Sequence, residues 1–179
     1  EASPAGGLRE ETHQREQYWF DEPTLARLGQ LVWQYDHAVA LCCPRLGEYM
    51  AEERKVRPPT VLDIDTRFEG APWFKVWDIH HPEPLSYKPK LIVFDPPFKT
   101  IKLDRLFAAL RVLTHKDFTV PLVIAWLKRN EGALLGTLGA YGLQSTGLKP
   151  GYVSCSPDAE FYANFDLRGS LCLGPEDAL

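Results

Sequence analysis

Apolar residues recur at intervals of three and four positions near the start of the chain, between residues 22 and 35. This spacing places them along one face of an α-helix. Asp21 followed by Pro23 is typical of a helix start, with an N-cap side chain and an early-turn proline. The pattern predicts a helix from Glu22 to Tyr35 that packs one apolar stripe on a sheet, formed by Leu25, Leu28, Leu31, Val32 and Tyr35.

Short apolar runs follow this helix, each bounded by proline, glycine or charged residues. They occupy residues 37–43, 60–65, 74–78, 90–95 and 120–127. Runs that are apolar on both faces are typical of parallel strands covered by helices on both sides. Helical spacing returns at 46–53 and 103–113. This alternation predicts an α/β fold with a doubly wound, mainly parallel sheet, whose ligands bind at the carboxyl ends of the strands.

The last part of the chain has a different pattern. Strand-like segments at 144–148, 152–155 and 160–167 are separated by the turn sequences KPG and SPD, which predicts a closing antiparallel hairpin. Residues 1–14 are polar without periodicity and are expected to form a flexible extension. The 179 residues fit one folded domain, expected at 15–170 and followed by a tail at 171–179.

Composition and charge limit the classes of partner that the protein is expected to bind. With 20 basic and 24 acidic residues the net charge is −4, a poor match for a nucleic acid. However, residues 95–130 carry seven basic and three acidic residues, so a nucleic-acid substrate stays open. No apolar run approaches the roughly 18 residues of a membrane span, so no membrane contact is expected.

The cysteine and histidine positions indicate neither a metal nor a disulfide framework. Cysteines stand at 42, 43, 155 and 172 without a CxxC pair, and we interpret them as reduced thiols of a cytoplasmic protein. His80 and His81 are adjacent, so on an extended backbone their side chains point to opposite faces. We therefore expect no bound metal.

The sequence Asp95-Pro96-Pro97-Phe98 directly follows the predicted buried strand from Leu91 to Phe94. An acidic side chain at the carboxyl end of a strand lies in the ligand crevice, and prolines fix the backbone while leaving carbonyl oxygens free. Carboxylate and carbonyl oxygens accept hydrogen bonds from an amine, and an aromatic ring stacks on a base or contacts a cationic stem. The motif therefore predicts an amine-binding catalytic site without a covalent nucleophile. The alternative is a strand that ends in a rigid turn.

Six sequence pieces in a fixed order show a resemblance to a known family. In chain order they are QYWFDEPTLARL, ALCCPRL, LDIDTRF, WDIHHP, FDPPF and FYANFDL. Together, from Gln17 to about Leu167, they resemble the probable N6-adenine methyltransferases. That family includes lysine methyltransferases of translation elongation factor 1-alpha and, more distantly, a zinc-finger adenine methyltransferase of ribosomal RNA. The resemblance implies a Rossmann-like class I methyltransferase fold with S-adenosylmethionine as cofactor.

The resemblance also implies roles for three further aspartates. Asp63 is expected to accept hydrogen bonds from the ribose hydroxyls of S-adenosylmethionine, with Asp65 as the less favoured candidate for that role. Asp78 is expected to meet the adenine amino group. The alternatives are that Asp63 and Asp65 act as N-caps or pair with Arg67, and that Asp78 caps a turn.

The loop after the first strand-like run departs from most enzymes of this fold. Their glycine-rich turn is replaced by residues 43–47, CPRLG, and the resembling family likewise has a proline-containing loop there. Cys43 and Pro44 are therefore expected beside the amino-acid end of the cofactor. Arg45 either pairs with the cofactor carboxylate or is a solvated surface charge.

Three residues are candidates for substrate contact: Trp19, Phe20 and Lys99. Trp19 and Phe20 precede the first predicted helix, where they either form a wall over the target amine or anchor that helix to the sheet. Lys99 follows the Asp-Pro-Pro-Phe motif and begins the basic stretch, which is otherwise explained as the solvated face of a helix.

We expect methylation of a protein lysine in a translation elongation factor. This hypothesis is favoured by the full-length resemblance and the acidic charge. The first alternative is an adenine N6-methyltransferase acting on RNA or DNA, favoured by the motif at 95–98 and by the basic stretch. The second is a non-catalytic subunit of a larger complex, favoured by the missing glycine-rich turn.

Overall fold

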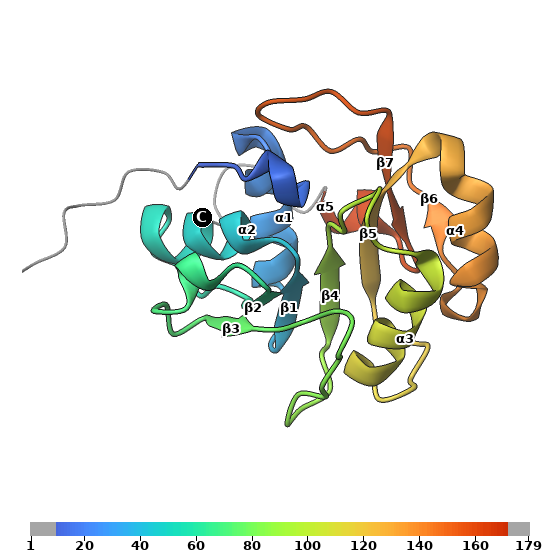
Figure 1. The fold of residues 1–179 in the computed structure, drawn as a ribbon, viewed down its shortest axis with the longest axis horizontal. Coiled ribbons are helices and arrows are strands. Elements are labelled where there is room, and N and C mark those ends of the chain that lie inside the picture. Colours follow the sequence, from blue (N-terminus) through green and yellow to red (C-terminus); the bar gives the residue numbers. More distant parts are fainter. Residues whose placement is uncertain (1–9, 172–179) are drawn as a thin grey trace, which may run out of the picture.

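The computed structural model describes residues 10–171 as one seven-stranded sheet with helices on both faces (Figure 1). Five of the strands lie at the predicted apolar runs, and the other two lie in the C-terminal region. Their bounds are β1 Ala38–Leu41, β2 Thr60–Asp63, β3 Phe74–Val76, β4 Leu91–Phe94, β5 Leu122–Leu127, β6 Gln144–Ser145 and β7 Ala159–Ala163. The bounds of the main helices are α1 Glu22–Trp33, α2 Pro44–Glu48, α3 Leu103–Leu113, α4 Glu131–Thr137 and α5 Leu167–Leu171.

The strand order is β3-β2-β1-β4-β5-β7-β6. Strands β3, β2, β1, β4 and β5 are parallel, whereas β7 runs antiparallel to both β5 and β6. The chain proceeds outward from β1 in one direction and from β4 in the other, so their junction is the topological switch point where ligands bind in such sheets. The predicted α/β fold with a C-terminal antiparallel pair is confirmed.

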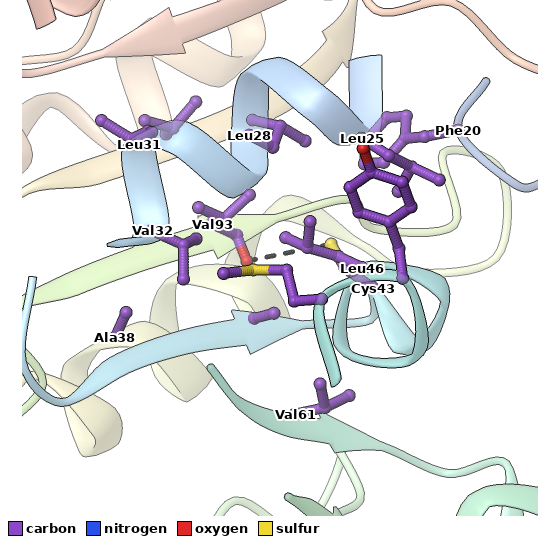
Figure 2. Packing of buried hydrophobic residues seen from close by; sticks show 14 of the residues in the cluster. Phe20, Leu25, Leu28, Leu31, Val32, Ala38, Cys43, Leu46, Val61 and Val93 are labelled. Atoms are coloured by element: carbon purple, nitrogen blue, oxygen red, sulfur yellow. Dashed lines mark hydrogen bonds between the residues drawn. The ribbon is translucent and has the colours of Figure 1, made fainter. Parts of the chain in front are cut away.

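Alternate residues of each buried strand enter two different cores. In β1, Ala38 and Ala40 belong to the core under α1 and α2, while Val39 and Leu41 face the core under α3 and α4. Figure 2 shows the first of these cores, where Leu25, Leu28 and Val32 of α1 pack beside strand and loop residues. Burial on both faces explains why the strands are continuously apolar.

The first helix begins as predicted and ends two residues earlier than predicted. The Asp21 side chain accepts a hydrogen bond from the backbone N–H of Thr24 at 3.0 Å, and a proline occupies the first turn. The helix ends at Trp33, with Gln34 as its C-cap. The predicted helix at 46–53 is α2, which begins at Pro44 and continues as a wider π-helical segment, Tyr49–Glu53.

Short 3-10 turns connect several of these elements. They span His13–Arg15, Thr66–Phe68, Lys128–Asn130 and Gly139–Tyr141. Residues 1–9 and 172–179, most of the expected extension and tail, lie outside the described residues. Residues 10 and 11 contact the domain, because Arg67 donates to the Glu10 carbonyl at 2.9 Å and the Trp19 N–H donates to the Glu11 carboxylate at 2.7 Å.

The C-terminal region differs in part from the prediction. Residues 144–148 supply only the two-residue strand β6, and the segment expected to end as a strand at Leu167 instead begins α5 there. Residues 152–155 form no strand, since Tyr152 makes a single antiparallel bridge with Phe20. This segment thus pairs with residues just before α1, far away in sequence, and not with its neighbours.

Candidate functional site

A cavity of about 280 Å³ lies at the carboxyl ends of the parallel strands, next to the switch point between β1 and β4. Five segments and Tyr152 line it. The lining comprises residues 16–19, 42, 63–65, 77–80, 95–101 and 152. The motif at 95–98, the three predicted aspartates, Trp19 and Lys99 therefore share one cavity, as the positions of strand ends in a parallel sheet require.

Asp95 is the first residue after β4 and is held at the cavity by two hydrogen bonds. Its backbone N–H donates to the Leu41 carbonyl at 3.2 Å, and its carboxylate accepts from the Tyr152 hydroxyl at 2.8 Å. Burial raises the pKa of Asp95 to about 8, although the hydrogen bond from Tyr152 acts to lower it. Close to neutral pH this carboxyl group is therefore present in both protonation states.

The rest of the motif is rigid. Pro96 is buried, and the Phe98 ring packs edge-on against Trp126, with ring centroids 5.8 Å apart and planes at 85°. The backbone N–H of Lys99 donates to the Glu16 carboxylate at 3.0 Å, while the Lys99 side chain is exposed. The segment before α1 thus closes one side of the cavity against the motif.

Asp63 ends β2 and is buried, with 8% of its surface exposed. One carboxylate oxygen accepts a hydrogen bond from the Asp65 backbone N–H at 2.8 Å. The Asp63 carbonyl accepts from the Trp77 N–H at 2.9 Å, which ties the ends of β2 and β3 together. Asp63 therefore presents a carboxylate to the cavity from a fixed backbone.

Asp65 also lines the cavity, but it is engaged with neighbouring side chains. The Arg67 guanidinium donates to both carboxylate oxygens, at 3.0 Å from Nε and 2.7 Å from Nη2, and the Gln17 amide donates at 2.8 Å. Burial acts to raise the pKa of Asp65, yet these hydrogen bonds outweigh it and hold the pKa below its usual value. This arrangement corresponds to the pairing with Arg67 that the sequence left open.

Asp78 follows β3 and combines both expected features, since it lines the cavity and also caps a turn. Its carboxylate accepts from the His80 backbone N–H at 2.9 Å and contacts the His81 ring nitrogen Nδ1 at 2.8 Å. The hydrogen bond with His81 is the main cause that lowers the pKa of Asp78. Asp78 is therefore ionised at neutral pH.

The loop after β1 presents a different cysteine from the one predicted. The Cys43 thiol lies in the core, where its one proton is within reach of two carbonyl oxygens, Leu41 at 3.3 Å and Val93 at 3.9 Å; Figure 2 shows the second contact. Pro44 is buried at the start of α2. Neither of these two residues lines the cavity, whereas Cys42 does, in a left-handed conformation with φ of 59°.

Arg45 fits neither role considered for it. Its side chain is only 12% exposed and pairs with Glu48 at 3.4 Å and Glu53 at 2.5 Å, both within the same helical stretch. Gly47, two residues further on, packs so closely on β2 that an added Cβ would lie 2.5 Å from Val61 and 2.6 Å from Trp73. This glycine therefore serves helix packing and lies outside the cavity lining.

The two aromatic residues before α1 differ in position. Trp19 lines the cavity and meets Phe68 edge-on, with ring centroids 6.2 Å apart. Phe20 lies outside the lining and packs against Tyr152 and Phe161, with centroids 5.1 Å and 6.1 Å away. Trp19 is thus the wall residue of the pair, and Phe20 anchors α1 and the Tyr152 segment.

Several residues that line the cavity were given no role in the site from the sequence, among them Glu16, Cys42 and Tyr152. Tyr152 was assigned to a strand, and no local pattern links it to Asp95, which lies 57 residues earlier. Its neighbours Val153 and Cys155 are also apolar, so nothing in the local sequence distinguishes Tyr152.

Residues 10–171 contain neither a metal-binding cluster nor a membrane-spanning helix. No group of three or more histidine, cysteine, aspartate or glutamate side chains in this range is arranged to hold a metal ion. None of the helices described there is long and apolar enough to cross a membrane.

Comparison with protein-family models gives a match over most of the chain. The sequence model of a family described as "probable N6-adenine methyltransferase" matches residues 11–167, which include every segment of the cavity lining. No curated protein matches the chain significantly.

Proposed function

The chain belongs to the probable N6-adenine methyltransferase family, and from this membership we propose that it transfers a methyl group from S-adenosylmethionine to a protein lysine. The observation that carries the proposal is the half-buried carboxyl group of Asp95, adjoining Pro96 and Phe98 in an acidic cavity at the switch point. Membership itself establishes a methyltransferase family. The choice of lysine over adenine rests on the chemistry of the cavity.

The cavity suits the proposed cofactor because its carboxylates are able to accept hydrogen bonds from the hydroxyl and amino groups that S-adenosylmethionine carries. S-adenosylmethionine supplies an electrophilic methyl group on a sulfonium, together with a ribose diol and an adenine ring. Asp63 would accept hydrogen bonds from the ribose hydroxyls, and the Asp78 segment would meet the adenine. The loop from Cys42 to Pro44 would adjoin the amino-acid end through its backbone, since the Cys43 side chain is committed to the core.

A lysine side chain has to lose a proton before its nitrogen can attack a methyl group. Asp95 suits this requirement, because a carboxyl group whose pKa is about 8 both accepts a hydrogen bond and takes up a proton near neutral pH. The Pro96 carbonyl is a second acceptor, and the Phe98 ring, braced on Trp126, is a rigid face for the apolar stem of lysine.

The charges around the cavity favour a cationic substrate over a polyanion. Five residues with carboxyl side chains line it, and Lys99 is the one lysine or arginine in that lining; the five are Glu16, Asp63, Asp65, Asp78 and Asp95. None of the other basic residues of the stretch belongs to this lining. Arg111, in the last turn of α3, lies over the Phe107 ring at 5.7 Å. A nucleic acid would need a basic surface beside the site.

An elongation factor is the proposed protein substrate, on the strength of the six ordered sequence pieces that resemble its lysine methyltransferases. Adenine N6-methylation is the second candidate, favoured by the description of the matching family and by an aromatic ring beside Asp95 that is able to stack on a base. A non-catalytic role is the third, favoured by the missing glycine-rich turn.

The proposal is tested by methyl transfer into a fractionated cell extract. Radiolabelled S-adenosylmethionine is added with the wild-type protein or with Asp95→Ala, and the label is counted in the protein and RNA pools. We expect label in protein, recovered as methyl-lysine after hydrolysis and absent with Asp95→Ala. Label that enters only RNA, and disappears with Asp95→Ala, would establish adenine methylation in place of the lysine reaction.

A further inference from the structure

Tyr152 contributes a hydroxyl group directly to the proposed catalytic carboxylate. Its oxygen lies 2.8 Å from one carboxylate oxygen of Asp95, and within residues 10–171 no other side chain hydrogen-bonds that carboxylate. We propose that Tyr152 is a positioning residue for Asp95, which holds one carboxylate oxygen and leaves the other for the substrate amine. This inference rests on the proposed function of Asp95.

The position of Tyr152 is fixed by contacts on both sides of it in sequence. The Val153 N–H donates to the Trp19 carbonyl at 2.9 Å, and the Asp21 N–H donates to the Gly151 carbonyl at the same distance. The Gly151 N–H in turn donates to the Thr24 hydroxyl at 2.8 Å. Residues 151–153 are therefore joined to the start of α1 by a short antiparallel ladder.

The Tyr152 ring is also held in place. It packs against Phe20 with ring centroids 5.1 Å apart, and the two residues form the isolated bridge between their backbones. A phenylalanine at this position would keep the ring packing and the backbone ladder. The hydroxyl group is thus the part of Tyr152 that packing does not explain, and its one proton is directed at Asp95.

The hydrogen bond has a defined electrostatic effect. Burial raises the pKa of Asp95 to about 8, and the bond from Tyr152 opposes this by favouring the ionised form. Burial also raises the pKa of Tyr152 well above its usual value, so the hydroxyl remains a donor throughout the neutral range. Tyr152 therefore stabilises the ionised carboxylate and does not itself exchange a proton.

Few other groups interact electrostatically with Asp95 in the described chain. They are the thiols of Cys42 and Cys43 after β1, and of Cys155 in the same loop as Tyr152. Burial raises the pKa of all three thiols, so they are neutral where Asp95 titrates. The ionisation of Asp95 is thus governed by burial and by the one hydroxyl group.

The test compares Tyr152→Phe with the wild-type protein and with Tyr141→Phe. Tyr141 is a matched control, because its buried hydroxyl bonds Thr114 at 2.9 Å and lies outside the cavity lining. The first readout needs no cofactor: the Asp95 carboxyl carbon is titrated by NMR in protein labelled with ¹³C-aspartate and assigned with Asp95→Asn. The second readout is the pH profile of kcat/KM for methyl transfer.

We expect Tyr152→Phe to raise the pKa of Asp95 and to move the acidic limb of the pH profile upward by the same amount. At pH 7 kcat/KM should fall about tenfold, and much of the loss should be recovered at higher pH. Tyr141→Phe should change neither quantity. An Asp95 pKa that is unchanged or lowered in Tyr152→Phe would overturn the inference, as would a raised pKa with an unmoved pH profile. A raised pKa in a protein without any methyl transfer would support the coupling and refute the proposed function.

Discussion

The replacement Asp95→Asn is expected to stabilise the protein at alkaline pH while it removes activity. Burial raises the pKa of Asp95 from its ordinary value of 3.8 to about 8. Between these two pH values the folded protein binds a proton that the unfolded chain has released. The free energy of unfolding therefore falls as the pH rises through this range, because the carboxyl group is harder to ionise in the folded state.

The size of the effect follows from the same interval. If the whole difference between 3.8 and about 8 were realised, an ionised Asp95 would cost at most about 6 kcal/mol of unfolding free energy. The side chain borders a cavity and is half-buried, so solvent screening reduces the expected cost to about 1–3 kcal/mol. An asparagine at position 95 carries no charge, and its side-chain oxygen is able to accept the Tyr152 hydrogen bond.

Urea denaturation at pH 5 and pH 8.5 measures this difference. Asp95→Asn should be more stable than the wild-type protein at pH 8.5, and its advantage should be smaller at pH 5, where only the first part of the loss between 3.8 and about 8 has occurred. Asp78→Asn is the matched control: it makes the same chemical change in the same cavity, but the pKa of Asp78 is lowered by His81, so the variant should lose stability at pH 8.5. An Asp95→Asn variant that is less stable at pH 8.5, or equally shifted at both pH values, would refute the reasoning.

Two further predictions concern the segments that close the cavity. Gly151→Ala should lower the free energy of unfolding by about 2 kcal/mol or more in urea denaturation, because the added Cβ would overlap the Asp21 carboxylate. Gly70→Ala is the control, because an added Cβ there meets nothing within 4 Å. Equal losses in the two variants would contradict the close packing at Gly151. Asp65→Asn should lower the free energy of unfolding by about 1–2 kcal/mol at pH 7, because it weakens the pairing with Arg67. This difference in stability should shrink as the pH falls below 3.8, since the pKa of Asp65 is lowered in the folded state. A difference that stays constant in thermal melts down to pH 3 would contradict this.

The fold was predictable because the signals that specify it are local. Continuous apolar runs such as Leu91–Phe94 occur where helices cover both faces of the sheet, and Asp21 with Pro23 marks a helix start that the structure has at that residue. The place of the Asp95 motif in the cavity follows from the same logic, since it directly follows β4.

The missed features depend on contacts between distant parts of the chain. Tyr152 pairs with Phe20, more than a hundred residues earlier, and no spacing rule predicts that pairing. Adjacent cysteines are likewise indistinguishable in sequence, yet the left-handed backbone at Cys42 leaves that residue at the cavity while Cys43 enters the core. Helix α4 was also missed, because its seven residues include two glycines and one buried leucine.

Titration of the protein with S-adenosylmethionine by calorimetry tests the central claim most directly, because every step proposed for Asp95 requires the cofactor in the same cavity. The wild-type protein is expected to bind one equivalent, and Asp63→Asn about tenfold more weakly, the equivalent of about 1.4 kcal/mol. Absence of binding by the wild-type protein at millimolar cofactor would contradict the proposed methyltransferase activity and leave a non-catalytic role as the remaining hypothesis.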